Sequence, residues 1–439
     1  QYYKEKKNMK YNPVLTRVNN LIKISVACLT CLLLVIASLS GVTYTEGSWS
    51  PAKVGAAAID YDLYKPLKRG SHDLPHLRLV WNKNTDTSIS VIWSTKDFSV
   101  AGKTVYIDTT DHGTNKSKYK LIFNPTRIAK HRGLYTAVVK VYDLKPDTKY
   151  YFLVEDQRAG YLSKRYWFKT ASDDSNAPLY VVAGGDSRNN RAARRKSNMM
   201  VKNLRPDAVF FGGDFTDRGT EDQWRNWLDD WSFTFGDDGK IIPIVVTRGN
   251  HEYNAQATEV LFDAPKGTYY DVSFHGDLLN LYVLNTEVSM GGDQLQWLKK
   301  ALSRSGQFKW NKVIYHRAIR PHSHVKSEGW RQYRYWAPLF YEHKIDVVVE
   351  SDTHVMKITW PIKPSSEKDA VEGFIRDDIN GTIYVGEGTW GAPLKSANDP
   401  KIWTRAHDAV NQIKWIKITQ DNMTIKTVST DNALTVGRV

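Results

Sequence analysis

The sequence predicts an α/β layered domain, built as a β-sandwich flanked by helices, which is preceded by an all-β sandwich. Two observations lead to this order. Short alternating runs of apolar and polar residues fill residues 75–172, whereas apolar runs alternate with helix-like stretches over residues 178–430. A period of two marks half-buried strands, and strand–helix alternation marks a sheet covered by helices. With 439 residues, of which 41% are hydrophobic and 25% charged, the chain is long enough for two ordinary globular domains.

The first segment, residues 1–42, has the pattern of a signal peptide or a signal anchor. Six basic residues precede an uncharged apolar run of 19 residues, Ile24 to Val42. This is the layout of a secretory signal, and the run is also long enough to span a bilayer without cleavage. We therefore expect a periplasmic or secreted protein, with membrane attachment through the N-terminal segment if that segment is not cleaved. Residues 43–74 lack a clear period and are interpreted as a linker.

Charge and cysteine content narrow the function classes. The net charge is +14, and a cut after Ser40 would still leave +9, which favours anionic partners such as phosphorylated small molecules. The two cysteines, Cys28 and Cys31, both lie in the N-terminal segment, so a disulfide-stapled fold and a Cys-ligated zinc site are excluded. A nucleic-acid-binding protein is a weaker alternative, because no recognition motif supports a specific nucleic-acid partner.

The predicted first sandwich, residues 75–172, contains seven alternating runs separated by turn residues, the number typical of an antiparallel β-sandwich. Its segment Leu144–Tyr150 has the pattern of a tyrosine corner, in which a Tyr hydroxyl bonds to backbone upstream. The region resembles a fibronectin type III domain, and we expect it to cover its neighbour rather than carry chemistry. The runs are Leu77–Trp81, Ser88–Trp93, Thr104–Ile107, Tyr119–Phe123, Tyr135–Tyr142, Lys149–Glu155 and Arg165–Thr170.

In the second domain, residues 178–430, six apolar runs are interpreted as buried strands. They are Leu179–Ala183, Ala208–Phe211, Ile241–Val246, Leu281–Leu284, Val313–Tyr315 and Asp346–Val349. Four stretches between them are interpreted as helices that cover the sheet. They are Asn190–Leu204, Glu221–Trp231, Asp293–Ser303 and Trp330–His343.

Five of these strands end in residues that can bind metal. Ligands of open α/β sheets bind beyond the carboxyl ends of the strands, so we expect these side chains to meet at one edge. Carboxylates, imidazoles and one amide, without thiols, suit hard or borderline divalent metals. The residues are Asp186, Asp214, Asn250 with His251, His316, and Asp352 with His354.

In this order the motifs resemble those of the calcineurin-like metallophosphoesterases, whose signature is GD-x-H or a variant, GD-x-x-D, GNH-D/E, a lone His and GH-x-H. With the fibronectin-like sandwich in front, residues 75–430 are most similar to the purple acid phosphatase branch. The resemblance implies two divalent metal ions, from among Mn, Zn, Fe and Mg. Asp186 and His354 would hold the first metal, Asp214 would bridge both, and Asn250 and His316 would hold the second.

The same resemblance assigns His251 to the substrate phosphate and to protonation of the leaving alcohol. Asp217 and Arg218 match the GD-x-x-DRG form of Ser/Thr phosphatases, in which the Arg steadies phosphate through its bidentate fork.

Asp217 also stands where purple acid phosphatases have the Tyr that gives their colour, so we expect a colourless site. Arg188 stands where many relatives have a ligating His, and is expected to contact phosphate or to pair with an acid. Asp352 replaces the first His of GH-x-H; it either ligates, favouring Mn²⁺ or Mg²⁺, or marks a weakened second site.

The sequence therefore predicts an exported, acid phosphatase-like hydrolase that splits phosphate monoesters by attack of a metal-bound hydroxide, with His251 as general acid. A phosphodiesterase on the same site is the near alternative, since the loops that line the pocket would decide between the two esters. A non-catalytic binding protein on a metallophosphoesterase scaffold is a third possibility, because the altered last motif is compatible with loss of one metal.

Overall fold

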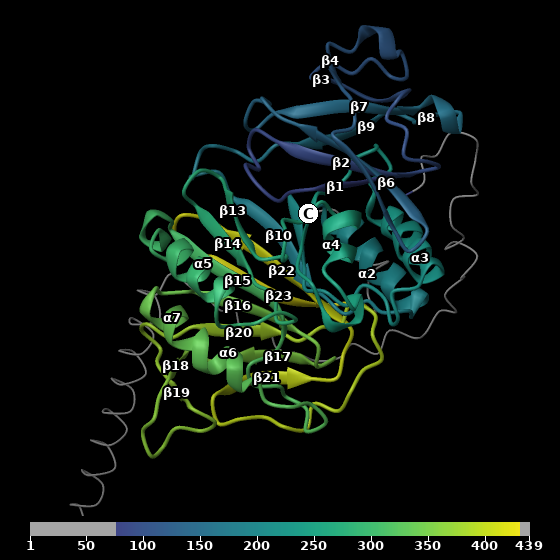
Figure 1. The fold of residues 1–439 in the computed structure, drawn as a ribbon. Helices are drawn as coiled ribbons and strands as arrows, with labels where there is room; N and C mark the ends of the chain where they lie inside the picture. The colour runs from purple at the N-terminus through teal and green to yellow at the C-terminus, as the bar shows by residue number, and fades with distance from the viewer. Residues whose placement is uncertain (1–75, 431–439) are drawn as a thin grey trace, which may run out of the picture.

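The computed structural model describes residues 76–430, which form two central sheets with helices on their outer faces (Figure 1). The predicted signal segment, residues 1–42, and the predicted linker, residues 43–74, lie outside the described residues. Within residues 76–430, no helix combines the length and the apolar character that a membrane crossing would require.

The first central sheet has nine strands, among which the neighbours β10, β11 and β12 run parallel. These are three of the strands that the apolar runs predicted, and all their residues are buried except the partly exposed Tyr180 of β10. In spatial order the strands are β23 (Met423–Ser429), β22 (Gln412–Ile418), β10 (Leu179–Gly184), β11 (Ala208–Phe211), β12 (Ile244–Val246), β1 (Arg78–Val80), β2 (Ile89–Thr95), β6 (Leu134–Val141) and β5 (Arg127–His131).

The second central sheet has seven strands, of which β14, β15, β16 and β20 run parallel. A separate hairpin pairs β18 (Ile362–Pro364) with β19 (Phe374–Arg376). In spatial order the seven strands are β13 (Tyr270–Phe274), β14 (Leu279–Val283), β15 (Trp310–Arg317), β16 (Val347–Ser351), β20 (Ile383–Gly386), β17 (Met356–Thr359) and β21 (Thr404–Asp408).

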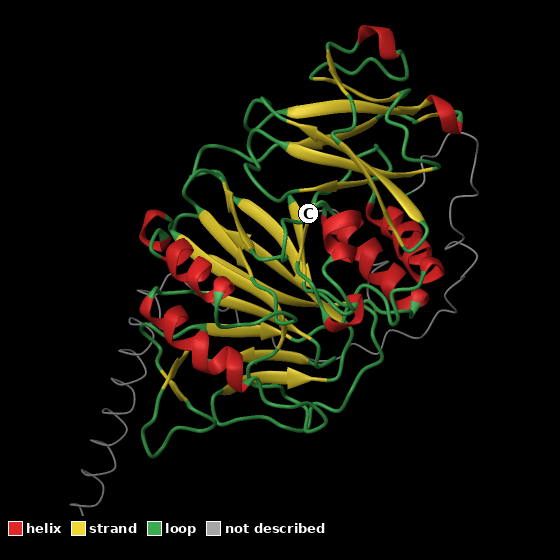
Figure 2. Cartoon of the chain, viewed as in Figure 1, coloured by secondary structure: helices red, strands yellow, loops and turns green. Residues whose placement is uncertain are grey.

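Helices cover the outer face of each central sheet, and the inner faces pack on each other (Figure 2). Apolar side chains of one helix group pack with the outer face of the nine-stranded sheet: α2 (Arg191–Leu204), α3 (Glu221–Trp231) and α4 (Gln256–Leu261). The other group covers the seven-stranded sheet: α5 (Asp293–Leu302), α6 (Trp330–Tyr335) and α7 (Ala337–Glu342). The predicted class, a β-sandwich flanked by helices, is confirmed. The stretch predicted as one helix over residues 330–343 is two short helices that meet at Trp336.

The N-terminal region is all-β and contains every one of the seven predicted strands. Its outer sheet consists of β4 (Leu121–Phe123), β3 (Lys103–Asp108), β7 (Lys149–Asp156) and β8 (Tyr161–Leu162), with β9 (Tyr166–Lys169) also paired to β7. The expected tyrosine corner forms, because the Tyr150 hydroxyl accepts a 2.8 Å hydrogen bond from the backbone N–H of Lys145. The pattern missed β5 and β8, which are short strands at the sheet edges.

The two parts of the chain share one sheet, a feature that the sequence did not predict. Strand β1 pairs antiparallel with β2 of the N-terminal region and parallel with β12 of the C-terminal region, at Val80 and Ile244. The backbone N–H of Trp81 also donates to the carbonyl of Ile244 at 3.1 Å. Hydrogen-bonded backbone therefore continues across the expected boundary between residues 172 and 178, and one apolar core includes residues from both sides of it.

Because the sheet and the core are continuous, we predict that the two regions unfold together. Differential scanning calorimetry of the full chain should give one transition whose calorimetric and van't Hoff enthalpies agree. Two resolved transitions would contradict this prediction, because they would show that the N-terminal sandwich is stable without its neighbour.

Candidate metal centre

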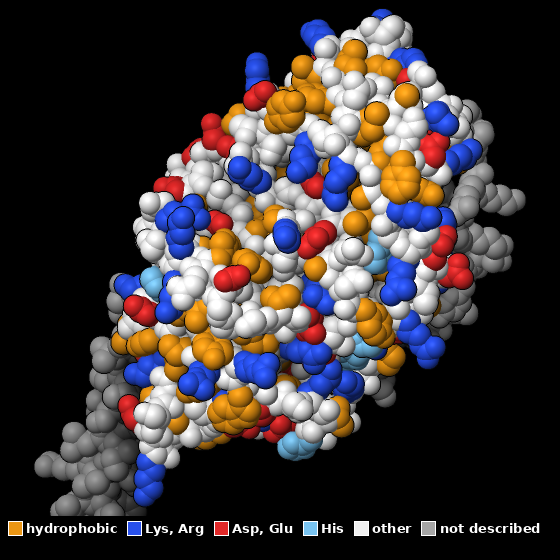
Figure 3. Space-filling view, viewed as in Figure 1, with side chains coloured by type: hydrophobic (Ala, Val, Ile, Leu, Met, Phe, Trp, Pro, Cys, Tyr) orange, Lys and Arg blue, Asp and Glu red, His pale blue; other side chains and the backbone are white. Residues whose placement is uncertain are grey.

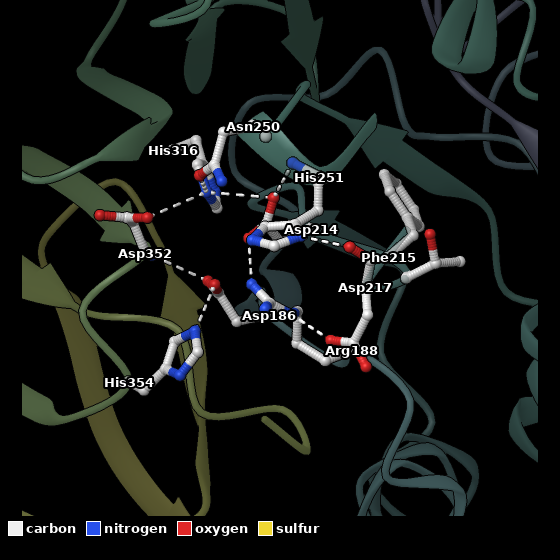
Figure 4. A network of polar contacts seen from close by, with 12 residues as sticks. Asp186, Arg188, Asp214, Phe215, Asp217, Asn250, His251, His316, Asp352 and His354 are labelled. Atoms are coloured by element: carbon white, nitrogen blue, oxygen red, sulfur yellow. Dashed lines mark hydrogen bonds and ion pairs between the residues drawn. The ribbon is translucent and has the colours of Figure 1, made fainter. Parts of the chain in front are cut away.

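The two central sheets bring their carboxyl-terminal strand ends to one place, where most of the predicted site residues meet (Figure 4). Asp186 and Asp214 follow β10 and β11 of the nine-stranded sheet, whereas His316 and Asp352 lie at the ends of β15 and β16 of the seven-stranded sheet. Asp186, Asp214 and His316 are fully buried, and one ligand atom of each lies within 4.8 Å of the other two. The site is therefore formed across the interface between the sheets.

Asp186 and His354 form the first half of the site. His354 Nε2 lies 3.1 Å from Asp186 Oδ1, and the other oxygen of Asp186 accepts a 2.9 Å hydrogen bond from the backbone N–H of Asp352. His354 Nδ1 lies 3.0 Å from the carbonyl oxygen of Pro393. A carbonyl only accepts, so Nδ1 carries a proton and Nε2 is the atom directed at the carboxylate.

His316 organises the second half of the site. Its Nδ1 lies 2.8 Å from the carbonyl oxygen of Gly212, which again leaves Nε2 to face the site. Three side-chain oxygens surround that nitrogen: Asn250 Oδ1 at 3.1 Å, Asp214 Oδ1 at 3.3 Å and Asp352 Oδ1 at 3.6 Å. The structure thus brings together the four residues that the sequence suggested for the second metal.

The donor set fits divalent metal ions. Two imidazoles are fixed by backbone carbonyls at Nδ1, the arrangement that orients metal-ligating histidines, and both direct Nε2 toward carboxylates. A neutral Nε2 has a lone pair, so His316 would face three oxygen acceptors without a proton to share. A cation between these atoms resolves the conflict. Oxygen and imidazole ligands without thiolate suit Mn, Zn, Fe and Mg, and the geometry does not choose among them.

The close packing of charged groups in the site shifts the pKa values of Asp214 and His316. Burial opposes the charge of Asp214, but the positive charge of His316 and hydrogen bonds outweigh burial, so the pKa of Asp214 lies well below its ordinary value. Burial lowers the pKa of His316, yet the carboxylates of Asp214 and Asp186 raise it well above the ordinary value. The carboxylate of Asp214 is therefore ionised at neutral pH and draws positive charge to the site.

Glu252 is a part of the site to which the sequence analysis gave no role. Its buried carboxylate accepts three backbone N–H bonds, from Gly249 at 2.6 Å, Phe215 at 2.9 Å and Asp214 at 3.0 Å. Burial and the charge of Asp214 raise the pKa of Glu252 to about 8, although these N–H donors act in the opposite direction. Glu252 therefore ties the turn that carries Asp214 to the turn that carries Asn250. Its place directly after Asn250 and His251 was the only signal in the sequence.

His251 lies beside the centre with its ring partly exposed. Its backbone N–H donates to Asp214 Oδ1 at 2.8 Å, and its Nδ1 bonds to the carbonyl oxygen of Asp217. That carbonyl fixes the proton on Nδ1 and leaves Nε2 facing the centre, 3.8 Å from Asp214 Oδ2. The ring can therefore present Nε2 to a bound molecule.

Arg188 and Asp217 form an ion pair at the site, whereas Arg218 lies apart from it. The guanidinium of Arg188 donates to Asp217 Oδ1 at 2.6 Å and to Asp214 Oδ2 at 2.9 Å, so of the two expectations for Arg188 the pairing with an acid is what the structure contains. Asp217 is thereby part of an ion pair beside the metal donors. Arg218 is exposed, and within residues 76–430 its guanidinium forms no ion pair with a site carboxylate.

Lys326 was not singled out from the sequence. Its ammonium lies 2.7 Å from Asp352 Oδ1, the same oxygen that faces His316. Burial raises the pKa of Asp352, but His316 and Lys326 outweigh burial and lower it below its ordinary value. Asp352 is therefore an ionised carboxylate that a lysine and a metal-site imidazole share.

The turns that carry the ligands have unusual backbone geometry. Asp186, Asp214, Asp352 and His354 all have positive φ, between 54° and 68°. Such conformations are uncommon outside glycine and gather at functional sites. Gly388, at φ 74°, packs so closely on Asp186 that a Cβ there would clash with the carboxylate. These local conformations direct the ligands into one small volume.

Comparison with known proteins agrees with this geometry. Residues 174–356 match the family model of the calcineurin-like phosphoesterases, and residues 74–170 match that of the purple acid phosphatase N-terminal domain. Purple acid phosphatase PPD1 from seeds of yellow lupin (Lupinus luteus) superposes with a TM-score of 0.66 at 16% identity, covering 82% of this chain and 73% of the lupin chain. The structure of PhoD gives a TM-score of 0.58 at 13% identity, covering 80% and 85%. No curated protein sequence matches the chain.

We predict that Glu252→Ala destabilises the protein. The change leaves three buried N–H groups without an acceptor, and each such loss costs about 1–3 kcal/mol, so unfolding in urea should show a total loss of about 3 kcal/mol or more. The exposed Glu367 provides the matched control, because Glu367→Ala should change stability by less than about 0.5 kcal/mol. Equal stability of the two variants would show that the carboxylate does not support the turns.

We also predict that Gly388→Ala impairs metal binding. The added methyl group must displace the Asp186 carboxylate, so elemental analysis after reloading with Mn²⁺ or Zn²⁺ should find less metal per chain than in the wild type. Gly306, where a Cβ would meet nothing within 4 Å, provides the control Gly306→Ala. Normal metal content in a folded Gly388→Ala variant would separate Asp186 from metal binding.

Proposed function

We propose that this chain, which belongs to the calcineurin-like phosphoesterases and carries a purple acid phosphatase N-terminal domain, hydrolyses phosphate monoesters with two divalent metal ions and His251 as general acid. The family is one of metal-dependent phosphoric ester hydrolases, so a phosphorylated substrate follows from membership. The ester class, the use of two ions in this chain and the role of His251 are the proposal.

One observation carries the proposal. Imidazole nitrogens and carboxylate oxygens from two different sheets converge on one buried volume, and the carboxylates there attract positive charge, since they raise the pKa of His316. Asp186 and His354 would hold one ion, Asn250, His316 and Asp352 the other, and Asp214 would contact both. Bound ions of this kind neutralise phosphate oxygens and make an attacking water more acidic.

His251 would supply the proton that the leaving alcohol needs. The Asp217 carbonyl fixes the proton of the neutral ring on Nδ1, so a second proton must reside on Nε2, which faces the predicted metal ligands. An imidazolium in this position can donate to an ester oxygen, as a general acid does.

Arg188 and Asp217 would act together in this proposal. Arg188 holds Asp214 and Asp217 at the same time, and its side chain is 17% exposed, so one guanidinium could stabilise the acid cluster and still approach a phosphate oxygen. The exposed Arg218 lies on the turn that carries Asp217 and is retained as a phosphate contact. The basic surface of the protein would favour the approach of such anions, and Lys and Arg side chains are spread over the face shown in Figure 3.

Export to the periplasm or beyond the cell is also part of the proposal. It rests on the basic and apolar N-terminal segment, with membrane attachment if that segment is not cleaved. The proposal includes no specific nucleic-acid partner.

The test of His251 as general acid compares two monoesters whose leaving groups differ in how much they need protonation. For 4-nitrophenyl phosphate, whose leaving group needs little protonation, His251→Ala should lower kcat only modestly. For glycerol 2-phosphate, an alkyl ester, we expect a loss of about 10²–10⁴-fold. All assays use the metal-reloaded protein. Bis(4-nitrophenyl) phosphate is the substrate that tests the diester alternative, and His112→Ala in the N-terminal region is the control variant.

Equal losses on the two monoesters would contradict the role of His251, although not the hydrolase. Faster turnover of the diester would favour the phosphodiesterase. Folded, metal-reloaded protein that cleaves none of these esters would favour the non-catalytic scaffold.

A further inference from the structure

Two lysines from separate loops lie at Asp352, on the seven-stranded-sheet side of the metal centre. Lys326 belongs to the loop between β15 and α6, and Lys395 to the long stretch between β20 and β21. The Lys326 ammonium contacts Asp352 Oδ1 at 2.7 Å, and the side chains of Lys326 and Asp352 are mostly buried. The backbone N–H of Lys395 donates to the carbonyl of His354 at 3.1 Å, which fixes Lys395 beside a predicted ligand.

Lys395 has no counter-charge of its own. Burial and the charge of Lys326 lower the pKa of its partly buried ammonium, whereas the charges of Asp352 and Asp186 act in the opposite direction. Within residues 76–430, however, no carboxylate oxygen lies within 4.0 Å of the Lys395 ammonium, the limit for an ion pair. Asp352, which also faces His316, is thus in contact with the ammonium group of Lys326 alone, and the charge of Lys395 is left without a carboxylate partner.

Neighbouring cationic side chains, in contrast to Lys395, are paired with carboxylates. Arg317, next to His316, is paired with Glu287 at 2.7 Å. Lys401, on the same stretch as Lys395, is paired with Asp399 at 2.6 Å and with Glu372 at 2.8 Å. An unpaired, partly buried ammonium beside another ammonium is unfavourable unless an anion joins them. The positive charge at Lys395 is therefore available to a ligand.

We propose that Lys326 and Lys395 form a second anion subsite, which binds a phosphate group of the substrate other than the one that is hydrolysed. The inference rests on the proposed function and narrows its substrate class to esters that carry two phosphate groups. Only the Asp352 side chain separates this subsite from the donors around His316, so both phosphates must belong to one compact molecule. Lysine suits the role because its ammonium is a compact point charge with three rotatable donors.

Fructose 6-phosphate and fructose 1,6-bisphosphate form a suitable pair of probes, because they share a sugar and differ in one phosphate. For metal-reloaded wild type we expect kcat/KM for phosphate release to be at least about tenfold higher for the bisphosphate, beyond the factor of about two given by its two esters. Hydrogen bonds to charged groups contribute about 1.5–3 kcal/mol, which corresponds to about 10–100-fold. Lys395→Met should reduce this preference at least about fivefold, whereas Lys395→Arg should retain most of it.

Lys118→Met, at an exposed lysine of the N-terminal region, is the matched control and should leave the preference unchanged. Circular dichroism confirms that each variant is folded. A wild type without preference, or a preference that Lys395→Met retains, would overturn the subsite.

Failure of the proposed function has a different signature, in which neither sugar phosphate is hydrolysed. Equilibrium dialysis of the two sugar phosphates against the metal-loaded protein then decides on the subsite. Tighter binding of the bisphosphate that Lys395→Met abolishes would support it, and equal binding of both probes would overturn it.

Discussion

The buried charge of Asp214 is the constraint on which the rest of the site depends. A carboxylate that is fully removed from water is costly unless cations and hydrogen-bond donors compensate for it. Here the compensation comes from both sheets. His316 approaches from β15, Arg188 from the turn after β10, and the backbone N–H of His251 from the turn after β12. Because these groups belong to different layers, only the packed sandwich can assemble them.

Two positions at which the chain differs from the purple acid phosphatase pattern, Asp217 and Asp352, have the same electrostatic arrangement. At each position where the chain has gained a carboxylate, it also supplies a cation. Asp217 is paired with Arg188, and Asp352 is paired with Lys326. Each added negative charge is thus balanced locally, and the carboxylates remain beside the predicted metal ligands without an excess of repulsion.

Stability of the site comes from elements that carry no chemistry. The apolar core between the sheets fixes the strand ends, and Glu252 ties two ligand turns together through backbone N–H groups. The N-terminal region contributes through β1, which extends the nine-stranded sheet next to β12. The strand that precedes Asn250 and His251 therefore has a neighbour on each side, although the N-terminal region supplies no metal ligand.

Local pattern in the sequence was sufficient for the fold class and for most of the candidate ligands. Apolar runs that end in Asp, Asn or His identify strands and their carboxyl ends, and those ends of parallel strands meet at one edge. The same pattern could not show that β1 joins the two regions, or that β22 and β23 complete the sheet beside β10, because strand pairing depends on residues far apart in the chain. Nor could it assign the partners of Arg188, Lys326 or Lys395. A charged side chain has the same letter whether it faces solvent or a buried carboxylate, and only the packing of loops from both sheets decides which it does.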